Sequence, residues 1–368
     1  ALAWEPAGAD KEENEAWYNY YLSLYEAGQG IWTQAPEGTD EIAPIQFSDM
    51  FGVARDDEKW DAFLNQLTWE ELKSVIHGQM YNSTIIERLG MPTIQAADGP
   101  GDVYNWHSLS RKGTYLPNAS MVASTWNDEL SHEYGVMIGN EAMWDDINQW
   151  YSPAVDMHRT PFSGRSFEYY SEESLLAGRI AGNIIKGTQE KGLICTLKHF
   201  GANEQEFNRS GLATFATEQT LREIYMKPFE ICVKNYDFDH NPLAVMSSFT
   251  LIGDHYTGAN SELLNGVLRG EWGFQGMVLT DWYGSYGYQL TMDSVLNGND
   301  MMLGGSNNGQ VWNWSAEALE GDPVLQAAVR ESYHRKLYSY ANSALLNGMT
   351  SDSGSSGVVV WWVATLTT

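Results

Sequence analysis

The densest group of polar side chains in the sequence is KHFGANEQEFNR, from Lys198 to Arg209. It follows the apolar run LICTL (193–197) and gathers a cation, an imidazole, amides, carboxylates and an arginine in one segment. Charged donors and acceptors at this density suit a ligand with several hydroxyl groups, because each hydroxyl both donates and accepts hydrogen bonds. Taken alone, the segment fits a salt-bridged loop equally well.

A second candidate is GFQGMVLTDW, from Gly273 to Trp282. Here Asp281 ends an apolar run and is followed directly by Trp282. A carboxylate beside an aromatic face is typical of a sugar site, in which it acts as a nucleophile or a base. An aspartate that follows a strand also commonly caps a helix, so that alternative stays open at this point.

Two shorter segments, AADGPG (96–101) and GRSFEYYSEE (164–173), contribute one further candidate each. Asp98 either accepts hydrogen bonds from ligand hydroxyls or orders the DGPG turn. Arg165 either donates to such hydroxyls or pairs with a neighbouring carboxylate.

These candidates must be positioned by regular elements, and the sequence alternates short apolar runs with amphipathic stretches. The runs that read as buried strands are 92–97, 150–157, 193–197, 243–248, 276–280 and 299–303. Helical periodicity begins near Trp60, after Ser171 and after Thr217, and the second of these stretches ends near Gly192. Thr68 and Glu71 have the spacing of a capping box. Strands alternating with helices predict a parallel sheet covered by helices.

Asp98, Lys198 with His199, and Asp281 each follow the carboxyl end of an apolar run. In a (β/α)8 TIM-like barrel these ends meet at one mouth, where the active site lies. An open doubly wound sheet is the alternative. No GxGxxG or Walker sequence follows a strand, so we expect the α/β barrel.

Composition narrows the classes of ligand. The 368 residues fit two domains or one large barrel, and the net charge of −27 argues against nucleic acid or an anionic membrane as a partner. Fifteen Trp and 20 Tyr offer flat faces for sugar rings, although packing alone explains most of them. No apolar stretch reaches the roughly 18 residues of a membrane span. The eight His and two Cys show no metal-binding spacing, and we expect Cys195 and Cys232 to be buried thiols.

We divide the chain into an extension or linker (1–59), a barrel (60–345), and a linker with an apolar tail (346–368). The tail contains SDSGSSG followed by the β-prone VVVWWVATLTT. We expect the tail to pair with a sheet edge or pack on another domain, with the start of an anchor as the alternative. The chain opens without Met or a signal peptide, which suggests a piece of a longer protein.

Together, the motifs resemble glycoside hydrolase family 3, the retaining enzymes of β-glucosidase type. They are ADGPG, HRTPFSGRSFEYYSEE, LKHFGANEQEFNR, VMSSF, RGEWGFQGMVLTDW and NGNDMML, and they span about residues 60–345. The stretch from Thr217 to Trp282 looks most like the subgroup with inverted domain order, in which an α/β sandwich precedes the barrel.

The resemblance implies that Asp281 is the nucleophile, forming a covalent glycosyl intermediate. It implies that the sugar is held by Asp98, Arg165, Lys198, His199, Arg209, Met246 and Trp282. Asp98 would bind hydroxyls at the far end of the ring, which favours glucose over xylose or arabinose. We further expect Arg165 and Lys198 to keep Asp281 ionised.

Retaining hydrolysis also needs an acid/base, with its carboxyl about 5–5.5 Å from that of the nucleophile. In the glucosidase-type members of the family this Glu comes from the α/β sandwich, so we expect it outside this chain: on a separate chain, on a removed segment or on a dimer partner. Candidates within the chain are Glu168, Glu204, Glu206 and Asp300, of which Glu168 and Glu206 are expected rather to brace the cations.

The sequence departs from the family pattern at two positions near the nucleophile. Phe249 stands where many members have a Tyr that approaches the nucleophile, and Thr280 replaces the usual Ser. After DGPG the chain continues DVYNW, which suggests a different aglycone side.

The sequence therefore predicts an exo-acting β-glucosidase without cofactor or metal. A β-xylosidase or other exo-glycosidase, and a sugar-binding barrel without turnover, are the alternatives. We read the sequons at Asn82, Asn118, Asn208 and Asn313 as chance matches and expect a bacterial source. A cytoplasmic and a cell-surface or secreted location both fit, and membrane anchoring and an oligomeric state stay open.

Overall fold

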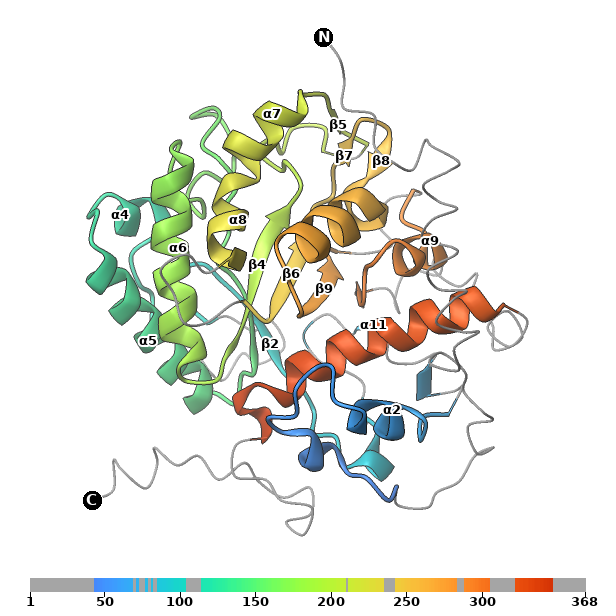
Figure 1. Ribbon diagram of the computed structural model, residues 1–368. Helices are drawn as coiled ribbons and strands as arrows, with labels where there is room; N and C mark the ends of the chain where they lie inside the picture. Colours follow the sequence, from blue (N-terminus) through green and yellow to red (C-terminus); the bar gives the residue numbers. More distant parts are fainter. Residues whose placement is uncertain are drawn as a thin grey trace, which may run out of the picture.

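A parallel sheet forms the centre of the computed structural model, which describes residues 43–68, 71–72, 77–78, 81, 85–103, 114–209, 211–234, 242–282, 288–304 and 322–346. The sheet has five strands in the order β2-β3-β4-β6-β9, every neighbouring pair of which is parallel. They are β2 (Ala96–Asp98), β3 (Gln149–Tyr151), β4 (Ile194–Phe200), β6 (Ala244–Ser247) and β9 (Met277–Thr280). Helices lie between these strands in the sequence, so the expected α/β class is confirmed (Figure 1).

Two short strands continue the sheet beyond β9. A parallel bridge joins Leu279 to Met301, next to β10 (Met302–Leu303), and β10 pairs in parallel with β1 (His77–Gly78). The strands within the described residues do not close into a ring, so the TIM-like barrel expected from the sequence is not seen as such.

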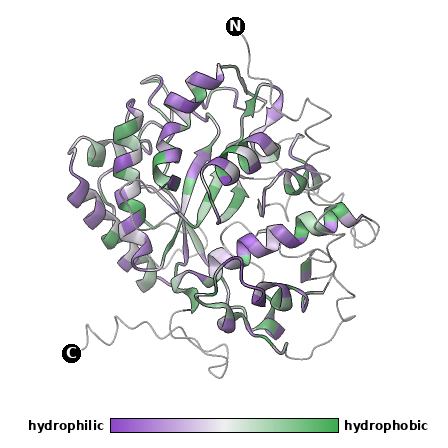
Figure 2. Ribbon diagram, in the orientation of Figure 1, coloured by the Kyte–Doolittle hydropathy of each residue, from purple (hydrophilic) through white to green (hydrophobic). Residues whose placement is uncertain are grey.

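Both faces of the sheet are buried, which is why the strands read as continuous apolar runs rather than as alternating ones. Successive side chains of a strand point to opposite faces. One face carries Ala97, Trp150, Cys195, Leu197, Val245 and Val278. The other face carries Ala96, Tyr151, Ile194, Ala244, Met246, Met277 and Leu279. Figure 2 shows green, hydrophobic colouring over part of the central strands, purple colouring on another part of the sheet, and mixed colouring on the surrounding helices.

Helices cover the first face. They are α4 (Ala119–Ala123), α5 (Asp128–Trp144), α6 (Ser174–Gln189), α8 (Lys227–Lys234) and the π-helix η6 (Glu262–Glu271). Helices α5 and α6 pack with their backbones close together. Gly187 permits this approach, because a Cβ at this position would overlap the carbonyl oxygen of His132. The core between these helices and the sheet contains Ile180 and Ile184, as the helical period predicts.

The second face is covered by α11 (Pro323–Ala341), beyond which α2 (Lys59–Leu64) packs (Figure 1). Phe47 and Met50, in the 3-10 helix η2 (Phe47–Met50), are fully buried in this core. These two apolar side chains, from the segment that the sequence division calls an extension, therefore pack in the same core as α11 and α2.

The remaining short elements complete the described chain. Strands β5 (Ala213–Thr214), β7 (Leu251–Ile252) and β8 (His255–Tyr256) form a small separate sheet. The helical segments are η3 (Glu87–Leu89), α7 (Glu218–Thr220), η4 (Leu221–Tyr225), η5 (Thr257–Ala259), α9 (Thr291–Leu296) and η8 (Ala344–Leu346).

Helix caps, one strand end and the two cysteines show how far local sequence patterns determine local structure. The capping box forms, because the Thr68 N–H donates to Glu71 Oε2 at 2.7 Å and the Glu71 N–H donates to Thr68 Oγ1 at 3.3 Å. Helix α7 begins directly after Thr217, as expected, and the Thr217 side chain caps it by accepting the N–H of Thr220. Strand β3 stops at Tyr151, well before residue 157, and Pro153 just beyond it has no N–H for a ladder. Cys195 and Cys232 are buried and free, as predicted.

Two other expectations concern the ends of the chain and the membrane. The apolar tail and residues 1–42 lie outside the described residues. Among the helices that are described, none combines the length and the apolar character needed to cross a bilayer.

Candidate active site

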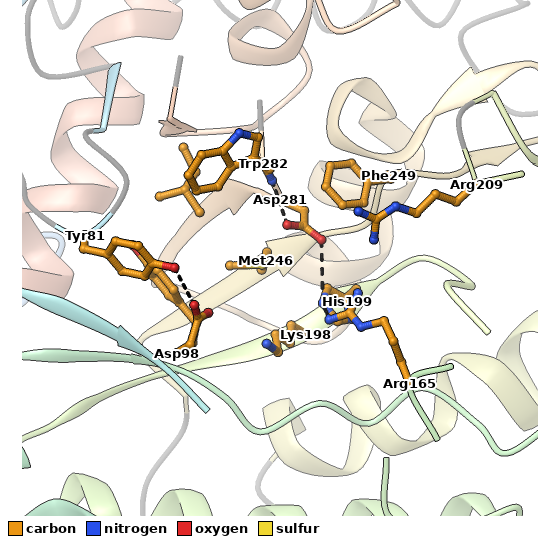
Figure 3. A pocket seen from close by; sticks show the side chains of 12 residues that line it. Tyr81, Asp98, Arg165, Lys198, His199, Arg209, Met246, Phe249, Asp281 and Trp282 are labelled. Carbon is orange, nitrogen blue, oxygen red and sulfur yellow. Dashed lines mark hydrogen bonds and ion pairs between the residues drawn. The ribbon is translucent and has the colours of Figure 1, made fainter. Parts of the chain in front are cut away.

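The carboxyl ends of β2, β4, β6 and β9 surround a cavity of about 310 Å³ (Figure 3). Twelve residues line it: Tyr81, Asp98, Tyr151, Arg165, Lys198, His199, Arg209, Met246, Phe249, Asp281, Trp282 and Leu303. The structure therefore brings together all eight site residues that the sequence suggested, although they come from segments up to 184 residues apart (98 to 282).

Three lining residues were not foreseen as part of the site: Tyr81, Tyr151 and Leu303. Tyr151 and Leu303 belong to apolar runs that we read only as strand core, and no spacing signal distinguishes Tyr81. Phe249 also lines the cavity, at the position where the family pattern has a tyrosine.

Asp281 follows the last residue of β9, and the hydrogen bonds of that strand fix its position. Its N–H donates to the Ser247 carbonyl oxygen at 3.0 Å, which anchors it to β6. The backbone N–H of Trp282 donates to Asp281 Oδ1 at 2.7 Å. The Asp281 side chain is 16% exposed, so its carboxylate faces the cavity while its backbone stays within the sheet.

Burial raises the pKa of Asp281 above the usual aspartate value, against the opposing charge of Arg165, the Trp282 N–H bond and the charges of Lys198 and Arg209. The charges of Arg165 and Lys198 act in the expected direction, because they favour the ionised carboxyl, but burial outweighs them and the net shift of the pKa is upward. Removing a carboxylate from water disfavours its charged form, and here this cost outweighs the attraction of the nearby cations.

Arg165 is anchored at each of its three nitrogens. Its Nε donates to Glu168, its Nη1 lies 3.3 Å from Glu206 Oε1, and its Nη2 lies 2.8 Å from Nε2 of His199. Lys198 Nζ lies 3.4 Å from the second oxygen of Glu168. The two glutamates thus hold the cations in place at the cavity.

His199 is buried at the end of β4, where the register with β6 shifts between Leu197 and Phe200. Its Nδ1 lies 2.9 Å from Oδ2 of Asp156, a fully buried carboxyl. Burial, with the nearby charges of Arg165 and Lys198, lowers the pKa of His199 well below its ordinary value. The lowered pKa favours the neutral form of the ring. Asp156 was not among the expected site residues because it lies inside an apolar run.

The opposite ends of the cavity differ in character. At one end the Tyr81 hydroxyl donates to Oδ2 of Asp98 (Figure 3). At the other, the guanidinium of Arg209 lies 4.4 Å above the ring of Phe249, and its Nη1 donates to Glu206 at 2.8 Å. The cavity therefore offers hydroxyl-binding groups at one end and a cation stacked on an aromatic ring at the other.

The acid/base candidates named from the sequence do not line the cavity. Glu168 and Glu206 bind Arg165, and Glu204 is buried, with Oε1 3.2 Å from the Met157 N–H. Asp300 lies in a different network, at 2.7 Å from Arg269 and 2.8 Å from Arg335. Within the described residues, the carboxyl groups that line the cavity are those of Asp98 and Asp281.

The described residues contain no group of three or more His, Cys, Asp or Glu side chains arranged to hold a metal ion. The cavity presents the carboxylate of Asp281, which accepts the backbone N–H of Trp282. Cations lie beside this carboxylate, and further hydrogen-bond donors and acceptors surround it. Such a cavity can bind a polyhydroxylated ring and present an oxygen nucleophile to it.

Comparison with known proteins adds sequence and structural relatives. A family model described as "Glycosyl hydrolase family 3 N terminal domain" matches residues 37–332. A beta-glucosidase of Rhizobium radiobacter is 39% identical over 280 residues, which cover 75% of this chain and 33% of that protein. Beta-glucosidase A of Butyrivibrio fibrisolvens is 37% identical over 249 residues, 66% of this chain and 29% of that protein.

Solved structures match as well. Beta-glucosidase 3B from Thermotoga neapolitana, in complex with glucose, aligns with a TM-score of 0.69 at 32% identity over 84% of this chain and 46% of that one. A beta-glucosidase from Paenibacillus barengoltzii aligns with a TM-score of 0.73 at 27% identity, over 89% and 37% of the two chains. The chain spans about a third of the length of the curated relatives, 29% and 33% of the two named above.

Proposed function

Because this chain belongs to glycoside hydrolase family 3, we propose that it carries the sugar-binding site and the nucleophile of a retaining, exo-acting β-glucosidase. The family resemblance read from the motifs is confirmed by the matched family model and by the relatives. The observation that carries the proposal is the position of Asp281, which directly follows β9 and faces a polar cavity beside Arg165 and Lys198.

In the proposed reaction, an oxygen of Asp281 attacks the anomeric carbon of a β-glucoside. A carbon–oxygen bond forms to Asp281 while the glycosidic bond breaks, and the leaving oxygen takes a proton from the acid/base. Water then hydrolyses the glycosyl ester, and the acid/base removes its proton. Arg165, Lys198 and Asp98 would hold the sugar hydroxyls, and hydrogen bonds that strengthen as charge develops on the ring lower the barrier.

We propose that the acid/base comes from outside this chain. This is supported by the placement of the in-chain glutamates, which bind cations or the backbone instead of lining the cavity. It is also supported by the length of the relatives, about two thirds of which lies beyond the matched part. A second domain or a second chain can supply the missing carboxyl group.

We also propose that the sheet belongs to a (β/α)8 barrel domain over residues 60–345, with residues 43–59 packed against it. The hydrogen bond from the Ala96 N–H to the Tyr81 carbonyl oxygen, at 2.7 Å, supports this. It links β2, at one edge of the five-stranded sheet, to the chain just after β1. Strand β1 pairs with β10, which lies beyond the opposite edge strand, β9.

A sugar-binding barrel without turnover is the second candidate, because the cavity keeps its hydroxyl-binding residues while no described in-chain carboxyl beyond Asp98 and Asp281 faces it. A β-xylosidase or another exo-glycosidase on the same scaffold is the remaining enzyme alternative.

Aryl glycosides with a 2,4-dinitrophenyl leaving group separate these candidates, because that group departs without protonation. We expect rapid release of dinitrophenol from the β-glucoside, at least one equivalent per chain, and slower release from the β-xyloside. Asp281→Ala should release none. The exposed Glu190→Gln serves as the control and should behave as the unmodified chain.

Absence of release from every glycoside, while glucose still raises the melting temperature, would favour the binding barrel and refute the enzyme. Faster release from the xyloside would instead reassign the sugar.

A further inference from the structure

A buried carboxyl lies behind the site, on the far side of His199 from the cavity. Asp156 is 0% exposed and His199 is 1% exposed. Oδ2 of Asp156 accepts the backbone N–H of His199 at 3.0 Å and lies 2.9 Å from its Nδ1. Oδ1 faces the backbone N–H of Asn203 at 3.3 Å. The carboxyl therefore meets donors on both of its oxygens.

The protonation of His199 follows from its partners. A guanidinium has N–H donors and no acceptor. Because Nη2 of Arg165 lies 2.8 Å from Nε2 of His199, Nε2 must be the acceptor and carries no hydrogen. A neutral imidazole then has its hydrogen on Nδ1, which donates it to Asp156. The lowered pKa of His199 agrees with a neutral ring.

We propose that Asp156 is a positioning residue of this site: it holds His199 in the Nδ1–H tautomer, so that Nε2 accepts from Arg165 and fixes the guanidinium beside Asp281. The inference deepens the proposed function, on which it rests for the roles of Arg165 and Asp281.

The consequence for Arg165 is geometric. Glu168 holds Nε, Glu206 holds Nη1 and His199 holds Nη2, so the plane of the guanidinium is set by three separate partners. Two of its five N–H hydrogens have no protein partner within the described residues, and these can donate to a sugar hydroxyl. If His199 carried its hydrogen on Nε2 instead, it would face the Arg165 donor, and the guanidinium would turn away.

The consequence for His199 concerns the substrate. With Nε2 unprotonated and its lone pair directed to Arg165, this nitrogen can donate no hydrogen bond to a sugar hydroxyl or to Asp281. The contact of 3.6 Å between Nε2 and Oδ2 of Asp281 is then proximity rather than an ion pair.

The first test is nitrogen NMR of the histidine side chains in the full chain, with His199 assigned through its loss in His199→Gln. We expect His199 to report a neutral Nδ1–H ring at pH 8, above the pKa of about 7 to which burial raises Asp156, so that the accepting carboxyl is ionised. A ring protonated on Nε2, or on both nitrogens, would overturn the inference. This measurement needs no substrate, so it stands apart from any failure of the proposed function.

Two variants identify which neighbour sets the tautomer. In Arg165→Met, Asp156 remains, and we expect the Nδ1–H form to persist. In Asp156→Asn, whose amide can donate as well as accept, we expect a mixture or the Nε2–H form. Loss of the Nδ1–H form in Arg165→Met alone would assign the control to Arg165 and refute the role of Asp156.

Kinetics separate positioning from folding. For Asp156→Asn we expect the dinitrophenol burst rate from the β-glucoside to fall roughly 10- to 100-fold, by analogy with the loss of a partner that orients a metal-binding histidine. The matched control is Glu190→Gln, which removes the carboxylate 3.0 Å from the half-buried His132 and should leave the rate unchanged. An unchanged rate in Asp156→Asn, with the tautomer altered, would show that the tautomer does not position Arg165.

Discussion

Nε2 of His199 and Oδ2 of Asp281 lie 3.6 Å apart, which is contact without a hydrogen bond. The lone pair of Nε2 is already directed to Arg165 at 2.8 Å, so the neutral ring adds no charge to the neighbourhood of Asp281. The carboxylate is stabilised by fixed cations, with Arg165 as the largest, and by the Trp282 N–H. Its titration should therefore respond to Arg165 more than to any other single side chain.

Arg165→Met should move the acid limb of activity to higher pH. Burial raises the pKa of Asp281 and Arg165 opposes this, so losing the cation raises the pKa further. A nucleophile must be ionised, so activity is lost as pH falls through that pKa, and the loss would now begin at a higher pH. The measurement is the pH dependence of the dinitrophenol burst from the β-glucoside.

Arg165→Lys keeps a positive charge and should show a smaller shift than Arg165→Met. An acid limb that stays in place in Arg165→Met would mean that this charge does not control Asp281.

Asp98→Ala should reduce selectivity for glucosides over xylosides. A carboxylate that binds hydroxyls at the far end of the ring contributes to glucose and less to xylose, which lacks the hydroxymethyl group. We expect kcat/KM for the glucoside to fall about 10- to 100-fold, since a hydrogen bond to a charged group contributes about 1.5–3 kcal/mol. Parallel kinetics with the two aryl glycosides measure the ratio.

Tyr81→Phe removes the hydroxyl that donates to Asp98. It should lower kcat/KM for the glucoside by a smaller factor than Asp98→Ala does. In the double variant the two losses should not add, since the tyrosine acts through the carboxylate. Full additivity would separate Tyr81 from Asp98 and contradict this coupling.

Glu204→Gln should flatten the pH dependence of stability. Burial raises the pKa of Glu204 to about 8, so the folded state binds its proton more tightly than the unfolded state. The corresponding stability is complete below the ordinary glutamate value and is lost as pH rises through about 8. Glutamine keeps a neutral group in place.

The melting temperature of the unmodified chain should therefore fall between pH 5 and 8. In Glu204→Gln this decrease should be smaller. A recovery of roughly 2–4 °C at pH 8 corresponds to about 1 kcal/mol in a domain of this size. An identical slope in both proteins would show that Glu204 titrates normally.

Gly187→Ala should destabilise the fold without touching the site. The added Cβ would overlap the backbone of α5 at His132. Because the interface between the two helices is close-packed, moving them apart would lower the free energy of unfolding. We expect a loss of about 1–3 kcal/mol in the free energy of unfolding. Gly266→Ala, where a Cβ meets only the Ser261 oxygen at 4.0 Å, should cost nothing or stabilise. Urea unfolding of the two variants compares them, and equal losses would contradict the packing argument.

The sequence predicts those site residues that have a charged or hydrogen-bonding side chain and also follow the carboxyl end of a predicted strand. Lys198, His199 and Asp281 follow apolar runs, and parallel strands bring their carboxyl ends to one edge, so their meeting follows from the topology alone. Asp98 follows from the same argument, whereas Arg165 was added through the order of the motifs. The parallel α/β sheet was predictable for the same reason, since its strands are buried on both faces.

What the sequence did not reveal depends on contacts between distant residues. Asp156 lies in an apolar run, 43 residues before His199 in the sequence. The two side chains come into contact only because strands β3 and β4 pair. Tyr81 carries no periodic signal, and its contact with Asp98 depends on how the chain after β1 returns to β2. The direction of the Asp281 pKa is a balance of burial against cations, which spacing cannot weigh.

The central claim is that Asp281 forms a covalent bond to the sugar, and trapping that bond tests it most directly. The reagent is a 2-deoxy-2-fluoro-β-glucoside with a dinitrophenyl leaving group, which slows both steps but retains a leaving group that needs no acid. We predict that intact-mass spectrometry finds one fluoroglucosyl group per chain, that peptide mapping places it on Asp281, and that Asp281→Ala acquires none. An adduct on another residue, or none while glucose still stabilises the chain, would contradict the assignment of Asp281 as the nucleophile.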